Sequence, residues 1–115
     1  MRIADRENRV SLAELQEMAA GMFGDIVKAV VDVKREMLVV DAELHADEES
    51  YLLENGSDPA DLWGINLYPG MDCASFIEFD SMTNLRPSRG NRSRGVEDPS
   101  LRERIQAIVN DLVSR

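Results

Sequence analysis

The sequence predicts a single α+β domain that spans residues 1–115, with a four-stranded, mainly antiparallel sheet and helices packed on one face. Three observations predict this fold class. Segments with apolar residues at helical spacing alternate with pairs of short segments rich in β-branched residues. A polar turn of three residues joins the first pair, as in a hairpin. A chain of 115 residues fits one domain and can bury roughly two-thirds of its unfolded surface.

The first half of the chain supplies one helix and two strands. Ser11 followed by Glu14 forms a capping box, which predicts a helix start, and Gly24 predicts the helix end. Residues 26–33 and 37–42 are the first two strands, because both are rich in valine and other apolar residues. The apolar face of the helix consists of Leu12, Leu15, Met18, Ala19 and Met22.

The second half adds another hairpin between two helices. A helix is predicted over residues 47–54, where Asn55-Gly56 ends it. Residues 63–68 and 75–81 are the third and fourth strands, and Asp98-Pro99 opens the last helix. The order of elements is αββαββα, and the order of the strands within the sheet stays open. The apolar stripe of the last helix consists of Leu101, Ile105, Ile108 and Leu112.

One face of the predicted sheet collects polar side chains. Successive side chains of a strand point to opposite faces, so each strand divides into an apolar set for the core and a second, polar set. The polar set comprises Asp41, Glu43, Asn66, Tyr68, Glu78 and Asp80, and His45 follows in register with the first two. This surface is either the solvated face of a two-layer domain or a binding surface, in which a cation or arginine offsets the crowded acids.

Five residues of this surface are candidate ligands for a divalent metal. Carboxylates and imidazole suit magnesium, manganese or zinc. The spacing Asp41-x-Glu43-x-His45 is compatible with a site on a strand, and Glu78 and Asp80 add carboxylates from the fourth strand. A lone histidine is also often structural. No cofactor is assigned, and a divalent metal at these residues is an alternative hypothesis.

An arginine-rich segment follows the fourth strand. Residues 84–96 contain proline and glycine and lack periodicity, which predicts a loop; residues 86–96 are named the arginine loop below. Guanidinium groups pair bidentately with phosphate or carboxylate, and Gly and Ser let backbone amides approach an anion. Candidate ligand-binding residues are Arg86, Arg89, Asn91, Arg92 and Arg94 of this loop, together with Tyr68 of the third strand.

Three interpretations of the arginine loop stay open. Its arginines bind an anion, such as the phosphate of a small molecule or a short nucleic-acid feature, or they fix the loop by salt bridges to the acidic sheet face, within the chain or across a dimer. The third interpretation is a disordered, tail-like loop. The loop lacks the Gly-Lys-Ser/Thr of a Walker motif.

Charge, hydropathy and cysteine content exclude several classes of protein. The net charge of −9 argues against general nucleic-acid binding, because such a field repels phosphate backbones. No apolar run approaches the roughly 20 residues of a membrane-spanning helix, and the N-terminal residues do not read as a signal peptide. Cys73 is the single cysteine, which excludes an internal disulfide and a thiolate-rich zinc site. We therefore expect a cytoplasmic protein.

Four segments resemble a family of short, uncharacterised prokaryotic proteins. They are VDAELHAD (residues 40–47), DLWGINLYP (61–69), FIEFDSM (76–82) and NRSR (91–94). The resemblance covers nearly the whole chain. It implies a free-standing cytoplasmic protein, but the family has no assigned activity, cofactor or catalytic residue to transfer.

We interpret the chain as a binding or interaction module, expected to be a homodimer, with its site between the acidic sheet face and the arginine loop. The four arginines would be anion ligands or partners across the subunit interface. The alternative is a metal-dependent hydrolase or phosphodiesterase. There the acids would hold the cation, His45 would act as ligand or base, and the arginines would stabilise a phosphoryl group.

Overall fold

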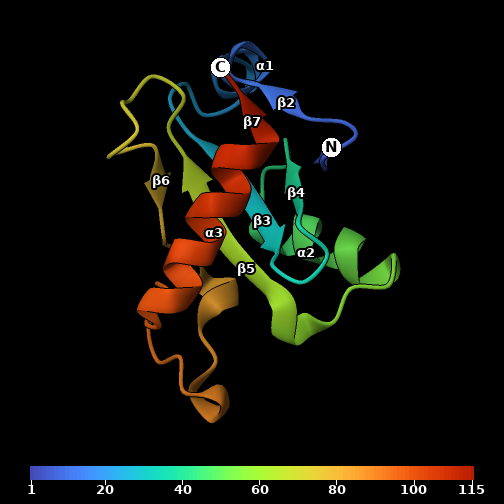
Figure 1. Cartoon of the computed structure of the whole chain (residues 1–115), viewed down its shortest axis with the longest axis vertical. Helices are drawn as coiled ribbons and strands as arrows, with labels where there is room; N and C mark the ends of the chain where they lie inside the picture. The colour runs from blue at the N-terminus through green and yellow to red at the C-terminus, as the bar shows by residue number, and fades with distance from the viewer.

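The computed structural model describes residues 1–115 and confirms an α+β fold (Figure 1). All neighbours in the five-stranded main sheet are antiparallel, and a short parallel pair lies apart from it. In sheet order the five strands are β1 (Arg2–Ala4), β4 (Met37–Val40), β3 (Val27–Asp32), β5 (Leu62–Leu67) and β6 (Ile77–Glu78). The parallel pair consists of β2 (Val10–Ser11) and β7 (Val113–Ser114). The helices are α1 (Leu12–Gly21), α2 (His45–Glu54) and α3 (Pro99–Leu112).

Both predicted hairpins are confirmed, but the prediction of four strands is wrong. β3 pairs with β4 and β5 pairs with β6, while β1 adds an edge strand in which Ile3 pairs with Val39. The sequence did not predict β1, because three residues are too few to display a period of two. The fourth predicted strand, residues 75–81, is reduced to the two paired residues of β6.

The starts of α1 and α3 follow the predicted capping signals, whereas α2 begins at His45, two residues before the predicted start, and has no side-chain cap. The Oγ of Ser11 accepts a hydrogen bond from the N–H of Glu14 at 3.0 Å, and Glu14 Oε2 accepts one from the N–H of Ser11 at 2.8 Å. Asp98 caps α3 by accepting a hydrogen bond from the N–H of Ser100 at 2.9 Å. None of the helices is both long enough and apolar enough to cross a membrane.

The larger hydrophobic core lies between one face of the sheet and helices α1 and α3. In Figure 1, α3 crosses in front of the strands. Its buried Ile105 and Leu112 belong to the same cluster as Leu15 of α1 and as Ala29 and Val31 of β3. This is the face that the alternation of side chains assigned to the core.

The opposite face carries a second, smaller core beneath α2, so the prediction that helices pack on one face is wrong. Leu52 of α2 is fully buried against Val30, Val39 and Leu62 of three neighbouring strands. Val39 lies two residues from Asp41 and therefore on the same face as the polar set, so part of the face expected to be solvated is covered by a helix. Polar side chains occupy only the remainder.

Candidate functional site

Asn84 ties the segment before the arginine loop to the edge of β5. Its fully buried amide accepts a hydrogen bond from the N–H of Gly64 and donates one to the carbonyl of Gly64, each at 2.8 Å. The side chain thus takes the place of a neighbouring strand, since β6 ends at Glu78. Only glycine fits at position 64, because a Cβ there would lie 2.6 Å from the Cβ of Ser81.

Asn91 fixes the shape of the arginine loop from inside. Its Nδ2 donates to the carbonyls of Asn84 at 2.7 Å and Gly95 at 2.8 Å, and its Oδ1 accepts the N–H of Glu97 at 3.0 Å. Only 6% of the residue is exposed. Asn91, a predicted ligand-binding residue, therefore supports the backbone of the loop.

Arg86 likewise packs onto the protein. Its guanidinium lies 4.6 Å from the centre of the Trp63 ring and donates to the carbonyls of Leu62 and Thr83. Glu49 of α2 lies 3.8 Å away, and 15% of the Arg86 side chain is exposed. Burial lowers the pKa of Arg86, and the carboxylate of Glu49 partly opposes this effect. Arg86 connects the loop to β5 and α2.

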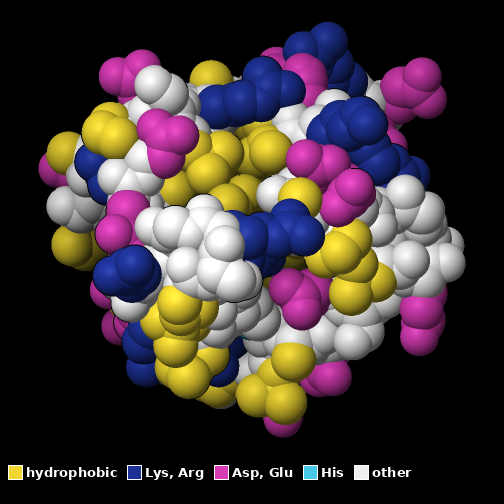
Figure 2. Space-filling view, turned by 90° about the horizontal axis from the view of Figure 1, so that it is seen from below, with side chains coloured by type: hydrophobic (Ala, Val, Ile, Leu, Met, Phe, Trp, Pro, Cys, Tyr) yellow, Lys and Arg dark blue, Asp and Glu magenta, His cyan; other side chains and the backbone are white.

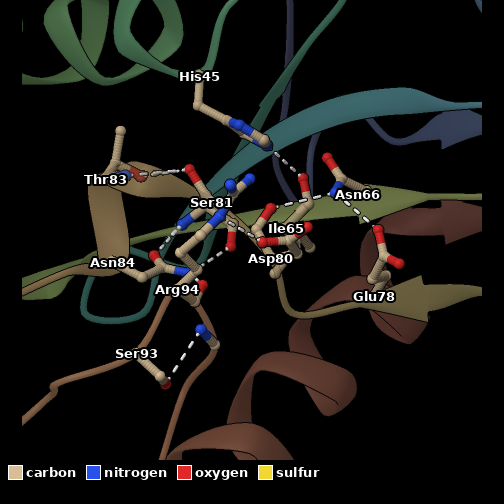
Figure 3. Close-up of polar contacts among 12 residues, drawn as sticks. His45, Ile65, Asn66, Glu78, Asp80, Ser81, Thr83, Asn84, Ser93 and Arg94 are labelled. Atoms are coloured by element: carbon tan, nitrogen blue, oxygen red, sulfur yellow. Dashed lines mark hydrogen bonds and ion pairs between the residues drawn. The ribbon is translucent and has the colours of Figure 1, made fainter.

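Arg94 links the loop to the acidic end of the sheet. Its Nε lies 2.7 Å from Oδ1 of Asp80, and both side chains are substantially exposed, at 56% and 44%. In Figure 3 the Arg94 side chain points from the loop toward Asp80. The predicted contact between the arginine loop and the acidic surface is therefore present at this one pair.

Arg89 and Arg92 extend from the loop without a protein partner. Both residues are exposed, and neither guanidinium forms a salt bridge or hydrogen bond within the chain. Arg89 closes a short 3₁₀ turn (Pro87–Arg89) that ends at Gly90, whose φ of 86° is left-handed. Two of the four predicted arginines thus keep all their donors free.

Glu97 places its carboxylate on the backbone of the same loop. Its Oε2 accepts hydrogen bonds from the N–H groups of Arg92 and Ser93, the second at 2.9 Å. Glu97 is exposed, as are both residues whose amides it contacts. Consecutive amides that converge on one oxygen bind anions well, because both dipoles point at the negative charge.

Glu78, Asn66 and Tyr68 are brought together, as their shared face predicted. Asn66 donates from Nδ2 to Glu78 Oε1 at 2.9 Å and to the carbonyl of Asp80 at 3.1 Å (Figure 3). The hydroxyl of Tyr68 donates to the same Glu78 oxygen at 3.0 Å. Burial raises the pKa of Tyr68, and the hydrogen bond to Glu78 raises it further, so the hydroxyl remains protonated.

Asp41 and Glu43 lie apart from this group. β3 lies between β4 and β5, so Lys28 of β3 separates Asp41 from the acids of β6. Asp41 has a left-handed φ of 70°, and β4 ends just before it. The chain then leaves the sheet and His45 begins α2, so the prediction that His45, just past the strand end, follows in register with Asp41 and Glu43 is wrong.

His45 instead contacts the backbone of β5. Its Nε2 lies 2.8 Å from the carbonyl oxygen of Ile65, so Nε2 carries the proton (Figure 3). Burial lowers the pKa of His45, which favours the neutral ring. No three His, Cys, Asp or Glu side chains are grouped as metal ligands would be. The five predicted ligands are not gathered, and the metal-dependent alternative stays a prediction.

Glu48 is a buried acid that the sequence interpretation missed. Glu48 belongs to α2 and is fully buried. Its Oε2 accepts a hydrogen bond from the N–H of Ala42 at 3.2 Å, and its Oε1 has no hydrogen-bond partner. Burial raises the pKa of Glu48 to about 9, so the side chain is neutral at pH 7. Its burial could have been predicted from its position four residues before Leu52, because residues four apart share a helix face. For Asn84 no local signal existed.

Comparison with protein families finds a match over most of the chain. The family model described as "Protein of unknown function (DUF5674)" matches residues 5–112. No curated protein matches the chain. No solved structure matches it either. The match agrees with the resemblance to an uncharacterised family.

Proposed function

We propose that this chain, which belongs to the family of proteins of unknown function DUF5674, is a binding module that holds the phosphate group of a small molecule at its arginine loop. Arg89 and Arg92 would supply free guanidinium groups, and Arg94 would supply donors that its contact with Asp80 leaves unused. Pairs between guanidinium and phosphate are charge-assisted and bidentate, so they bind phosphate with defined geometry.

The main support is that the loop keeps its shape without Arg89 and Arg92. Asn84, Asn91 and Arg86 make the contacts that fix the backbone, and these contacts are buried or partly buried. Holding a loop by salt bridges would require each arginine to meet an acid. A loop whose conformation is set in advance loses little entropy when it binds a ligand.

The charge distribution also favours this end of the molecule for an anion. Residues 1–83 contain 18 of the 22 acidic residues, whereas four arginines and no acid lie between Arg86 and Arg94. Figure 1 shows the arginine loop at one extremity of the long axis, and Figure 2 views that end, where Lys and Arg side chains lie among Asp, Glu and hydrophobic ones. Anionic ligands are repelled by most of the surface and attracted here.

A thermal-shift screen tests the proposal with pyrophosphate, nucleotides and sugar phosphates. A ligand at about 100 times its Kd adds ~2.7 kcal/mol of stability, which raises the Tm by about 10 °C in a chain of this length. The double variant Arg89→Ala/Arg92→Ala should weaken binding of that ligand at least tenfold by calorimetry, since each charged hydrogen bond contributes about 1.5–3 kcal/mol.

The matched control is Lys34→Ala/Arg115→Ala, which removes the same charge from exposed residues outside the loop. It should bind the ligand with nearly wild-type affinity. Equal weakening in both double variants would mean that net charge alone explains the binding. An unchanged affinity in Arg89→Ala/Arg92→Ala would exclude the loop as the site.

A further inference from the structure

We propose that the backbone amides of Arg92 and Ser93 form an oxyanion site, that Glu97 occupies it as an internal substitute for the ligand, and that a phosphate group binds by displacing Glu97. The inference rests on the proposed function, because it concerns the same loop. It adds the atoms that bind the anion and a residue that competes with it.

The first argument is the chemistry of the contact. One carboxylate oxygen, Oε2 of Glu97, accepts hydrogen bonds from two consecutive N–H groups. A phosphate oxygen presents the same kind of acceptor with more charge, about −1.5 to −2 for a phosphomonoester at neutral pH. The site therefore already holds an oxyanion of the class that the arginines would attract.

The second argument is that the loop does not depend on the Glu97 carboxylate for its shape. The carbonyl of Arg94 accepts hydrogen bonds from the N–H of Ser81 at 2.9 Å and from Nδ2 of Asn84 at 3.0 Å. Asn91 binds the backbone on both sides of the two amides. When the carboxylate leaves, these bonds remain and the amides keep their direction.

The third argument is access. Glu97 and the residues whose amides it contacts are all exposed, so an incoming anion reaches the amides from solvent once the carboxylate moves aside. The exposed residues Arg92 and Arg94 flank Ser93 in the chain, and of the two only Arg94 has a carboxylate partner, Asp80. Because Glu97 is attached to the same chain, it competes at a high effective concentration and weakens binding in the wild-type protein.

The test is a titration of the full chain with inorganic phosphate at constant ionic strength, followed by ¹H–¹⁵N NMR. In the wild type, the amide signals of Arg92 and Ser93 should shift most. Glu97→Gln removes the charge and keeps the shape of the competitor, so it should bind phosphate about tenfold more tightly, as expected when charge-assisted hydrogen bonds to a competitor are weakened. Unchanged signals in the remaining spectrum would verify that the variant is folded.

Glu103→Gln is the matched control, because Glu103 is an exposed acid on α3 without a salt bridge or hydrogen bond from its side chain. Its affinity for phosphate should stay close to that of the wild type. If Glu97→Gln binds no tighter than Glu103→Gln, while Arg89→Ala/Arg92→Ala still weakens binding, the amide site is refuted and the proposed function stands. If phosphate and the screened ligands bind none of these proteins, the proposed function itself fails.

Discussion

At the scale of single residues, the buried acid Glu48 has the clearest energetic consequence. Its carboxyl is fully buried, and one of its two oxygens has no hydrogen-bond partner. The loss of solvation raises its pKa to about 9. An unfolded glutamate ionises near pH 4.5. Between these values the folded state binds a proton that the unfolded state has lost, so the free energy of unfolding decreases as pH rises.

Glu48→Gln should remove this dependence. The glutamine keeps an oxygen that can accept the N–H of Ala42, and it cannot ionise. The variant should be more stable than the wild type at pH 8 by about 1–3 kcal/mol and nearly equal to it at pH 4. Chemical denaturation at several pH values measures the difference. Glu54→Gln, on the exposed side of the same helix, retains Glu48 and should keep the wild-type pH dependence. An identical pH dependence in Glu48→Gln and wild type would contradict the assignment.

At the scale of elements, the arginine loop separates arginines that hold structure from arginines that are free. Arg86 stacks on Trp63 and donates to two carbonyls, whereas the guanidinium of Arg89, three residues later, forms no hydrogen bond or salt bridge. The two residues have the same side chain in the same loop. Their substitution therefore compares a packed arginine directly with a free one.

Arg86→Ala should destabilise the protein by about 2–3 kcal/mol, because it removes packing on Trp63 and leaves the carbonyl of Leu62 unsatisfied. Arg89→Ala should change stability by less than about 0.5 kcal/mol. Urea denaturation of both variants checks the comparison. Equal effects would show that the stacking contributes no more than a surface side chain does.

The sequence predicted those features of the helices and strands that depend on neighbouring residues. Ser11 and Asp98 identify their helix starts, because capping depends on residues within one turn. The turn at Asp41 could not be predicted, since a left-handed aspartate has no distinct local pattern. The sequence did contain a signal that α2 covers part of this sheet face. Val30 and Val39 are apolar residues on the face assigned to solvent.

The sequence predicted which residues make up the candidate site, but only partly how these residues are arranged. The sequence identified the arginine loop and its proximity to the acidic end of the sheet, which the contact between Arg94 and Asp80 confirms. It did not distinguish Arg86 and Asn91, which support the loop, from Arg89 and Arg92. That distinction depends on which side chains the fold buries, and an irregular loop has no periodicity from which burial can be inferred.

At the scale of the whole molecule, the predicted homodimer can be tested by measuring the mass of the protein in solution. Light scattering after size exclusion should give about twice the chain mass of 12.9 kDa if two copies associate. If the arginines act across the interface, raising the salt concentration should favour the monomer, because exposed ion pairs are screened. A mass of one chain at all concentrations would exclude the homodimer.

The pairing of β2 with β7 joins Val10–Ser11 to Val113–Ser114, and so brings together segments about as distant in sequence as this chain allows. Contacts between such remote segments slow folding, because a long stretch of chain must be closed before they form. Formation of the β2–β7 ladder therefore closes one very long loop that contains strands β3 to β6 of the main sheet, and we expect this ladder to complete late on the folding pathway.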